Sequence, residues 1–473
     1  MHGQLYVGCG WRVPRSAAPL VVRSPHDGSV VGEAAQATIA DVDEAVDLAA
    51  AAFERGVWAD RPIEERIAAV ERLREHYAIR SDELARTISQ ENGSPITFSQ
   101  LGQVGAIPFL IDGFVAAARA LAWEDEIPGM LGVTRVWREP VGVVAAITAW
   151  NVPQILIVAK LVPALLAGCS VVVKPAPESP LDAVMLAEVL DEVGLPAGVV
   201  SMLPGGPEIG RHLVAHPGID KVAFTGSTAV GQQIAAVCGE QLKRTSLELG
   251  GKSAAIVLED ADVERTAAGL RFASFMNNGQ ACAAQTRVLA PRSRYAEVVD
   301  ALAAAVSSFV VGDPLDPATE IGPLVTPRQQ ARVQGYIELG AQEGARPVVG
   351  GGAVPAGGCY VAPTLFADVD NRMRIAQEEI FGPVVVVIPY DDEADAVRIA
   401  NDSPYGLGGS VWTADKSHGL ELARRVRTGM FGVNTFGPDT SAPFGGFKAS
   451  GIGREYGRFG IEAFVETKAV HGA

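Results

Sequence analysis

Short apolar segments alternate with helical patterns between residues 141 and 238 of this 473-residue chain. Strands are predicted at residues 141–150, 170–174, 199–203 and 219–225, and helices at residues 153–167, 181–193, 208–215 and 228–238. These strands are apolar along their whole length, which is typical of parallel strands covered on both faces. The pattern therefore predicts a doubly wound α/β sheet of the nucleotide-binding type.

A second alternation begins near residues 254–258 and predicts another α/β domain. Its further strands are expected at residues 287–290, 384–389, 410–413 and 429–433. Residues 40–92 are expected to be helical, with one helix capped at residues 41–44 and another begun by Pro62. The chain length agrees with two or three domains.

The net charge of −16 disfavours nucleic acid and anionic membranes as partners, because both require a basic surface. The most apolar stretch, residues 152–173, contains Pro153, Lys160 and Pro163. We expect it to form a buried helix and a buried strand, not a membrane span. The N-terminus has no basic start followed by an apolar core, so no signal peptide is expected.

The five cysteines are widely spaced and form no Cys-x-x-Cys pair: Cys9, Cys169, Cys238, Cys282 and Cys359. A disulfide framework or a zinc ribbon is therefore not expected. Reduced thiols in a cytoplasmic protein fit this distribution.

His212 and His216 have the spacing of a helical zinc pair, but Leu213 stands where that motif carries glutamate. Pro217 ends the predicted helix at once. Histidines at a helix C-terminus are favoured by the helix dipole alone, so we predict no metal site.

The candidate chemistry lies in two segments, Leu247-Glu248-Leu249-Gly250-Gly251-Lys252 and Gly279-Gln280-Ala281-Cys282. A thiol nucleophile needs a base, and the nearest histidines lie far upstream, so Glu248 is the candidate base for Cys282. A thiol with a carboxylate suits covalent capture of a carbonyl followed by attack of an activated water. Taken alone, a cysteine such as Cys282 is more often a small buried hydrophobic residue.

Residues 223–231 follow a predicted strand and open a helix, so Gly226 and Ser227 are placed to approach a diphosphate at the helix N-terminus. The segment is not Gly-x-Gly-x-x-Gly, and an ordinary capped turn explains it equally well. Lys174 and Asn151 both end predicted strands. Lys174 is either a cofactor ligand or a solvated lysine, and Asn151 either an oxyanion donor or a turn residue.

A phosphate-binding P-loop at residues 250–253 is excluded, because the Walker pattern needs glycine at position 246 and the chain has Ser246.

Taken in order, the motifs resemble those of the NAD(P)-dependent aldehyde dehydrogenase superfamily from about residue 20 to the C-terminus. The motifs that carry the resemblance are Ala149-Trp150-Asn151-Val152-Pro153, Lys174-Pro175, Phe224-Thr225-Gly226-Ser227-Thr228, the two segments around Glu248 and Cys282, Glu378-Glu379-Ile380-Phe381-Gly382-Pro383, Pro443-Phe444-Gly445-Gly446-Phe447-Lys448 and Ser450-Gly451-Ile452-Gly453-Arg454-Glu455.

The resemblance implies that Cys282 attacks the aldehyde, while the Asn151 amide and the Cys282 backbone N–H hold the oxyanion. Glu248 would then activate the water that releases a free carboxylic acid. Because family members that form acyl-CoA generally lack this glutamate, its presence favours hydrolysis. A CoA-acylating enzyme, a semialdehyde-specific enzyme and a non-redox thiol esterase are the alternatives.

The resemblance also implies which residues bind NAD, the expected cofactor: Trp150, Lys174, Gly226, Ser227, Gly231, Glu379 and Phe381. Many NAD-preferring members carry glutamate three residues after the lysine, where this chain has Pro177, and Glu178 follows it. NADP use therefore stays open.

The aldehyde channel implied by the resemblance has an apolar wall made of Val152, Ile155, Ala159, Ala281 and Phe444. No lysine or arginine stands there to pair with a substrate carboxylate. We therefore expect an uncharged aliphatic or aromatic aldehyde in preference to a carboxylated semialdehyde.

The implied domains are a Rossmann-type cofactor domain at residues 1–121 and 141–250 and an α/β catalytic domain at residues 251–450. A small β arm, at residues 122–140 and 451–473, would join subunits into a homodimer or homotetramer. The alternation of residues 134–140 suits an exposed strand, which agrees with such an arm.

Overall fold

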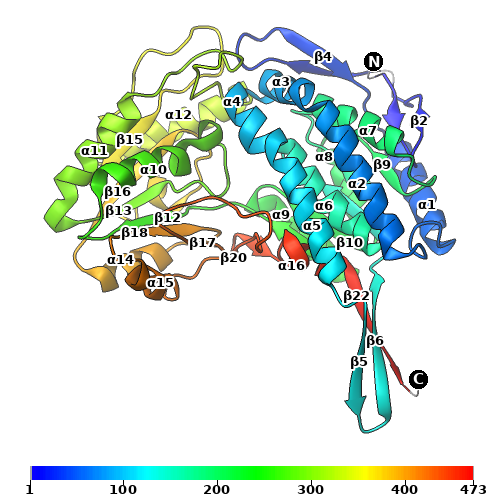
Figure 1. Ribbon diagram of the computed structural model, residues 1–473. Helices are drawn as coiled ribbons and strands as arrows, with labels where there is room; N and C mark the ends of the chain where they lie inside the picture. The colour runs from blue at the N-terminus through cyan, green and yellow to red at the C-terminus, as the bar shows by residue number, and fades with distance from the viewer. Residues whose placement is uncertain (1–2, 17, 472–473) are drawn as a thin grey trace.

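The computed structural model describes residues 3–16 and 18–471. Two α/β lobes lie side by side, and a slender three-stranded arm extends from the first of them (Figure 1). This is the predicted α/β fold.

The first lobe is built on an eight-stranded sheet. Its order is β2 (Trp11–Arg12), β1 (Leu5–Tyr6), β9 (Val200–Met202), β8 (Ser170–Lys174), β7 (Val143–Ile147), β10 (Lys221–Thr225), β11 (Arg244–Glu248) and β21 (Gly451–Ile452). The five strands from β9 to β11 are parallel, so the predicted doubly wound sheet is confirmed.

Successive residues of β7 explain why its sequence is apolar throughout. Val144 and Ala146 pack into one hydrophobic core, while Val143, Ala145 and Ile147 pack into another on the opposite face. The first core is formed with α2 (Ile63–Ile79), α3 (Ser81–Asn92), α5 (Ile107–Ala120), α6 (Pro153–Ala167) and α7 (Leu181–Val193). The second is formed with α1 (Ile39–Glu54), α8 (Pro207–Ala215) and α9 (Thr228–Glu240).

The start of α1 differs from the predicted cap. Thr38 is the N-cap and accepts from the backbone N–H of Asp41, whose carboxylate accepts in return from the Thr38 N–H at 2.8 Å. Asp41 is therefore the third residue of a capping box.

The second lobe is built on a seven-stranded sheet. Its order is β14 (Arg346–Val349), β15 (Thr364–Ala367), β16 (Val384–Tyr390), β13 (Arg287–Pro291), β12 (Ala254–Val257), β18 (Gly409–Trp412) and β19 (Gly432–Val433). One face is covered by α10 (Val263–Phe275) and α11 (Tyr295–Ser307). The other is covered by α12 (Pro327–Gln342), α13 (Arg374–Gln377), α14 (Glu393–Asn401) and α15 (Lys416–Ala423).

Two small antiparallel sheets of two strands complete the fold: β3 (Leu20–Arg23) with β4 (Val30–Ala34), and β17 (Tyr405–Gly406) with β20 (Phe447–Lys448).

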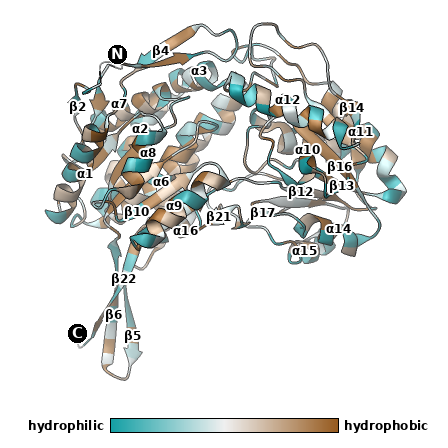
Figure 2. Cartoon of the chain, turned by 180° about the vertical axis from the view of Figure 1, so that it is seen from behind, coloured by the Kyte–Doolittle hydropathy of each residue, from teal (hydrophilic) through white to brown (hydrophobic). Residues whose placement is uncertain are grey.

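The arm consists of β5 (Glu124–Gly129), β6 (Gly132–Pro140) and β22 (Val465–His471), all antiparallel. Every residue of β5 is exposed, and Figure 2 shows this strand as largely hydrophilic. Within the expected arm segment 451–473, only β22 joins this sheet. β21 instead pairs with β11, and α16 (Gly457–Glu462) packs on α5 and α6, so residues 451–464 belong to the first lobe.

One helical stretch, residues 96–120, is long and apolar enough by length and composition to cross a membrane. It is interrupted by π-helical and 3-10 turns after α4 (Ile96–Phe98). Its last segment, α5, buries Ile107, Ile111 and Phe114 in the core of the first lobe, as a core helix does.

Candidate active site

The cysteine segment follows α10 through a 3-10 turn, Met276–Gly279, whose shape is unusual. Asn277 and Asn278 have positive φ angles of 52° and 61°, a region that asparagine tolerates better than most residues. The Asn277 side chain donates to the Asn151 carbonyl at 2.8 Å, and that of Asn278 donates to the Gly93 carbonyl at 2.9 Å. These two hydrogen bonds hold the turn before Cys282 against the first lobe.

Asn151 lies between β7 and α6 and is buried. Its side-chain amide donates to the Gln280 carbonyl at 3.0 Å, two residues before Cys282. The second amide hydrogen takes part in no hydrogen bond among the described residues. The structure thus places Asn151 against the cysteine segment and leaves one of its amide N–H donors free.

Glu248 is the last residue of β11, and its side chain is only 3% exposed. Neither carboxylate oxygen has a hydrogen-bond partner among the described residues. Burial, and then the charge of Glu455, raises the pKa of Glu248 well above its usual value, although Lys160 and Arg454 oppose this shift. Glu248 is therefore a carboxyl group with a high proton affinity and free oxygens.

The paired glycines bring three segments together at van der Waals contact. A Cβ on Gly251 would lie 2.3 Å from the Cys282 carbonyl oxygen, and a Cβ on Gly250 would lie 2.6 Å from Glu379 Oε2. The Gly251 N–H also donates to Glu379 Oε1 at 2.9 Å. Side chains are excluded here, which explains the two glycines after Glu248.

The thiol of Cys282 lies in the field of two carboxylates. Burial, and then the charges of Glu379 and Glu248, raises the pKa of Cys282 to about 12. Burial also raises the pKa of Glu379 to about 7. The cysteine is therefore a thiol at neutral pH and loses its proton only when a base accepts it.

The loop between β10 and α9 is tied to the strand that carries Glu248. The Gly226 N–H donates to the Glu248 carbonyl at 3.0 Å, and Ser227 caps α9 by accepting from the Val230 N–H. The N-terminus of α9 thus offers free N–H groups and a positive dipole end at this loop. Gly231 faces β11, where a Cβ would lie 2.4 Å from Leu249, so it permits close packing of α9 on the sheet.

Lys174, at the end of β8, is not a solvated lysine. Its side chain is buried and its ammonium group donates to the Pro175 carbonyl at 2.9 Å. Burial lowers the pKa of Lys174 to about 8, while the charges of Glu178 and Glu208 oppose this shift.

Phe381 and Trp150 meet edge to face, with ring centroids 5.4 Å apart. Phe381 has a φ of 64°, and two side chains of α12 hold this strained turn. Gln329 donates to the Phe381 carbonyl at 2.8 Å, and Arg332 donates to the Glu379 carbonyl at 2.6 Å. The sequence analysis did not identify Gln329 and Arg332. Their only sequence signal is a spacing of three residues on one helix, which places them on the same face.

A buried ion pair behind Glu248 was also missed. Lys160 of α6 is fully buried, and its ammonium group donates to Glu455 Oε1 at 2.7 Å and to Thr225 Oγ1 at 2.6 Å. The signal was a lysine inside an apolar helix, which requires a buried partner. The pair places one cation and one anion beside the carboxyl group of Glu248.

Replacing Lys160 with methionine is expected to destabilise the protein by roughly 3–5 kcal/mol, because Glu455 keeps a buried charge without its partner. Denaturant unfolding followed by circular dichroism measures the loss. The double variant K160M/E455Q should recover most of the lost free energy of unfolding, since no unpaired buried charge remains. A single variant as stable as the wild type would contradict the assignment of a desolvated pair.

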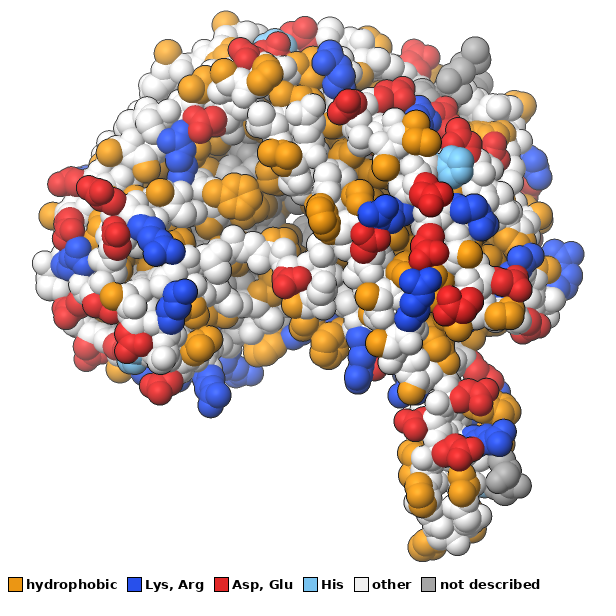
Figure 3. Space-filling view, in the orientation of Figure 1, with side chains coloured by type: hydrophobic (Ala, Val, Ile, Leu, Met, Phe, Trp, Pro, Cys, Tyr) orange, Lys and Arg blue, Asp and Glu red, His pale blue; other side chains and the backbone are white. Residues whose placement is uncertain are grey.

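The expected channel residues lie on two walls. Val152, Ile155 and Ala159 occupy α6 and the turn before it, and Ala159 is buried while the other two are half-buried. Ala281 and Phe444 are also half-buried, and Phe444 lines a cavity of about 290 Å³. Figure 3 shows that the surface is hollowed between the two lobes.

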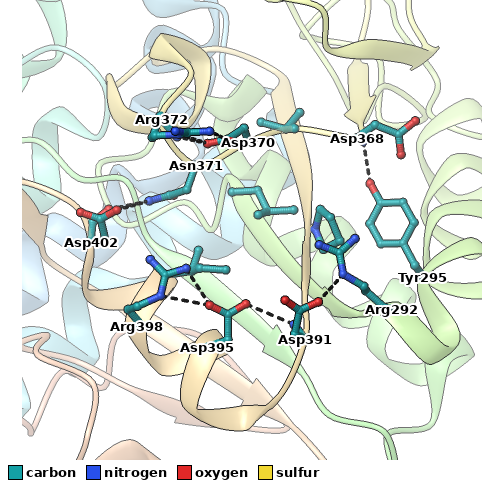
Figure 4. A pocket seen from close by; sticks show the side chains of 14 residues that line it. Arg292, Tyr295, Asp368, Asp370, Asn371, Arg372, Asp391, Asp395, Arg398 and Asp402 are labelled. Atoms are coloured by element: carbon teal, nitrogen blue, oxygen red, sulfur yellow. Dashed lines mark hydrogen bonds and ion pairs between the residues drawn. The ribbon is translucent and has the colours of Figure 1, made fainter.

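A larger cavity of about 810 Å³ lies in the second lobe and contains none of the predicted site residues. Figure 4 shows its charged lining. Most of these charges pair, as Arg398 does with Asp395 and Arg372 with Asp370, while Asp402 accepts from the Asn371 side chain at 3.0 Å. The lining formed by the described residues contains no cysteine, so the cavity lacks the predicted nucleophile.

His212 and His216 meet Asp43 of α1, and the three groups are close enough to hold a metal ion. His212 Nε2 lies 2.6 Å and His216 Nε2 3.5 Å from Asp43 Oδ1. However, His216 Nδ1 accepts from the Gly218 N–H at 3.1 Å, so its proton is on Nε2. His212 is hydrogen-bonded to Asp43 and His216 accepts from the Gly218 N–H, so neighbouring groups already account for the placement of both rings.

Comparison with known proteins identifies the family. Residues 11–470 match the sequence model of the aldehyde dehydrogenase family. Geranial dehydrogenase from Castellaniella defragrans is 47% identical over 472 residues, which cover 99% of this chain and 98% of that protein. The chain therefore belongs to the aldehyde dehydrogenase family, as its motifs predicted, and is an oxidoreductase that acts on aldehydes.

Solved structures show the same fold. An aldehyde dehydrogenase from Mycobacterium tuberculosis complexed with NAD+ has a TM-score of 0.98 and 48% identity, and the match covers 100% of this chain and 98% of that one. A mutant aldehyde dehydrogenase C from Pseudomonas syringae, complexed with NAD+ and octanal, has a TM-score of 0.95 and 40% identity. That match covers 99% of this chain and 96% of the other.

Proposed function

We propose that this protein oxidises an uncharged aliphatic or aromatic aldehyde to the free carboxylic acid with NAD+. The observation that carries the proposal is the junction at Gly250 and Gly251. There, the thiol of Cys282 lies within electrostatic range of the buried carboxyl group of Glu248, which comes from the other lobe.

In this proposal Cys282 loses its proton to a base, and its sulfur adds to the aldehyde carbon to form a thiohemiacetal. The spare amide hydrogen of Asn151 and the Cys282 backbone N–H stabilise the oxyanion. Bound NAD+ supplies the hydride acceptor, so that C–H cleavage leaves a thioester. Glu248 then removes a proton from water, the hydroxide adds to the thioester carbon, and the C–S bond breaks. The acid leaves and Cys282 recovers its proton.

The residues around the α9 N-terminus fit a dinucleotide. Gly226 and Ser227 present a helix N-terminus suited to a diphosphate. Glu379 uses only Oε1 in a hydrogen bond among the described residues, which leaves Oε2 for a ribose hydroxyl. Phe381 and Trp150 supply aromatic surface for the nicotinamide, and Lys174 lies at the strand end where an adenosine ribose would bind.

NAD is preferred over NADP in this proposal because of the charges near Lys174. Glu178 and Glu208 both act on the lysine, and two carboxylates would repel a 2′-phosphate. The complexes of two structural neighbours with NAD+ support this preference.

The substrate class is proposed from the apolar channel residues and from two relatives. Geranial dehydrogenase is named for geranial, and the Pseudomonas syringae enzyme was solved with octanal. Neither name indicates a carboxylated aldehyde, which agrees with the absence of lysine and arginine from the predicted wall.

The test is a panel of aldehydes assayed with NAD+ and NADP+, with and without CoA, while NADH, NADPH and the acid are measured. Uncharged aldehydes should turn over with NAD+ and give one acid per NADH without CoA. Turnover that requires CoA would overturn the hydrolytic step. A failure to bind either dinucleotide in a calorimetric titration would overturn the oxidation itself.

The arm is proposed to join subunits into a homodimer or homotetramer. Its outer strands, β5 and β22, leave backbone edges unpaired among the described residues, and its turn exposes Met130 and Leu131. Sedimentation velocity distinguishes monomer, dimer and tetramer.

A further inference from the structure

Tyr456 has a backbone conformation that tyrosine rarely adopts. Its φ of 67° and ψ of 155° lie in a region that is almost exclusive to glycine. Such strained residues cluster at active sites, where the surrounding structure holds them in place. A glycine would fit this backbone without strain, so the tyrosine side chain is the feature that needs an explanation.

The ring of Tyr456 lies against Phe444, one of the predicted channel residues. The ring centroids are 5.2 Å apart, and the planes are tilted by 38°. Two backbone hydrogen bonds of 2.8 Å, between Phe444 and Glu455, fix this arrangement. The backbone bridge therefore holds the two rings in a fixed relative position.

The aromatic pair lies next to the reacting groups. Phe444 is followed by Gly445, where a Cβ would lie 2.6 Å from Glu248 Oε1. Burial, and then the charges of Glu455, Cys282 and Glu248, raises the pKa of Tyr456, so its hydroxyl is within electrostatic range of the thiol and the carboxyl group. That hydroxyl forms no hydrogen bond with any described residue.

The ring of Tyr456 packs into the core that α6 helps to form. α16 packs on α6, and Tyr456 belongs to the same hydrophobic core as Ala159 of that helix. Tyr456 is 6% exposed, so its side chain is fixed by close packing.

We propose that Tyr456 determines substrate specificity: with Phe444 it forms an aromatic wall that selects aldehydes carrying an aromatic ring over saturated aldehydes of the same size. The inference rests on the proposed function, because it concerns the channel that leads to Cys282. The tilted ring pair presents π faces and edges to a bound aromatic group, which saturated carbons cannot match.

The experiment compares phenylacetaldehyde with cyclohexylacetaldehyde, which have the same number of carbon atoms. We expect Tyr456→Leu to lower the ratio of their kcat/KM values by about 2- to 12-fold, the range of a single aromatic contact. The change should come from the KM of the aromatic aldehyde, with kcat little altered. Tyr456→Phe should keep the wild-type ratio, because it keeps the ring.

Phe459→Leu is the matched control, since it removes an exposed aromatic ring from the same helix and should leave the ratio unchanged. An unchanged ratio in folded Tyr456→Leu, checked by circular dichroism, would overturn the proposal, as would an equal loss in Tyr456→Phe. If the wild type oxidises neither aldehyde, the proposed function fails instead, so the two failures are distinguishable.

Discussion

Replacing Cys282 with alanine should abolish aldehyde-dependent formation of NADH, with a loss on the order of 10⁴-fold or more. Cys282 is the thiol that the paired glycines bring beside Glu248 and Glu379. Without its sulfur no covalent intermediate forms. Hydride would then have to transfer directly from the unactivated aldehyde, which is much slower. The measurement is NADH absorbance at saturating aldehyde and NAD+.

The matched control is Cys359→Ala, which removes a buried thiol from the second lobe, outside the site. It should retain wild-type activity. The Cys282→Ala variant should still bind NAD+, which a calorimetric titration tests, because the expected cofactor groups are unchanged. Retained aldehyde oxidation in Cys282→Ala would refute the assignment of the nucleophile.

Replacing Glu248 with glutamine should slow steady-state turnover by about 10²- to 10⁴-fold, the usual contribution of a general base. The substitution should slow thioester hydrolysis more than hydride transfer, so a burst of about one NADH per site should remain. The burst itself should slow to the extent that Glu248 also accepts the Cys282 proton. Rapid-mixing absorbance separates the burst from the slow phase that follows. Glu240→Gln, at the exposed end of α9, is the control that changes a carboxylate outside the site.

The pH dependence follows from the raised pKa of Glu248. Only the deprotonated carboxylate can remove a proton from water, so turnover limited by hydrolysis should be low in acid and rise with pH through this pKa. Glutamine cannot titrate, and the slow phase of Glu248→Gln should lack that rise. A normal steady-state rate in the variant at neutral pH would eliminate the general-base role.

Much of the sheet architecture was predictable, because strands buried on both faces must be apolar along their length. β7 and β8 illustrate this, since successive residues of each enter different cores. The two-residue strand β21 and the six-residue helix α16 were not predictable, because neither is long enough to show a period. Residues 451–464 were therefore assigned to the arm in error.

Motifs were enough to propose Cys282, Glu248 and Asn151 as site residues, and the structure brings the Asn151 side chain to the cysteine segment. Contacts between distant segments were not. Lys160 and Glu455 are 295 positions apart, and only the fold shows that they meet. Tyr456 left no signal, because its backbone strain is a property of three-dimensional structure.

Gly250 and Gly251 have a further consequence. Glu248 ends a strand of the first sheet, whereas Cys282 and Glu379 belong to segments of the second lobe. Neither lobe alone contains both Cys282 and Glu248. If the proposed roles hold, the reaction centre is built across the boundary between the lobes, and any change that shifts one lobe against the other should alter catalysis directly.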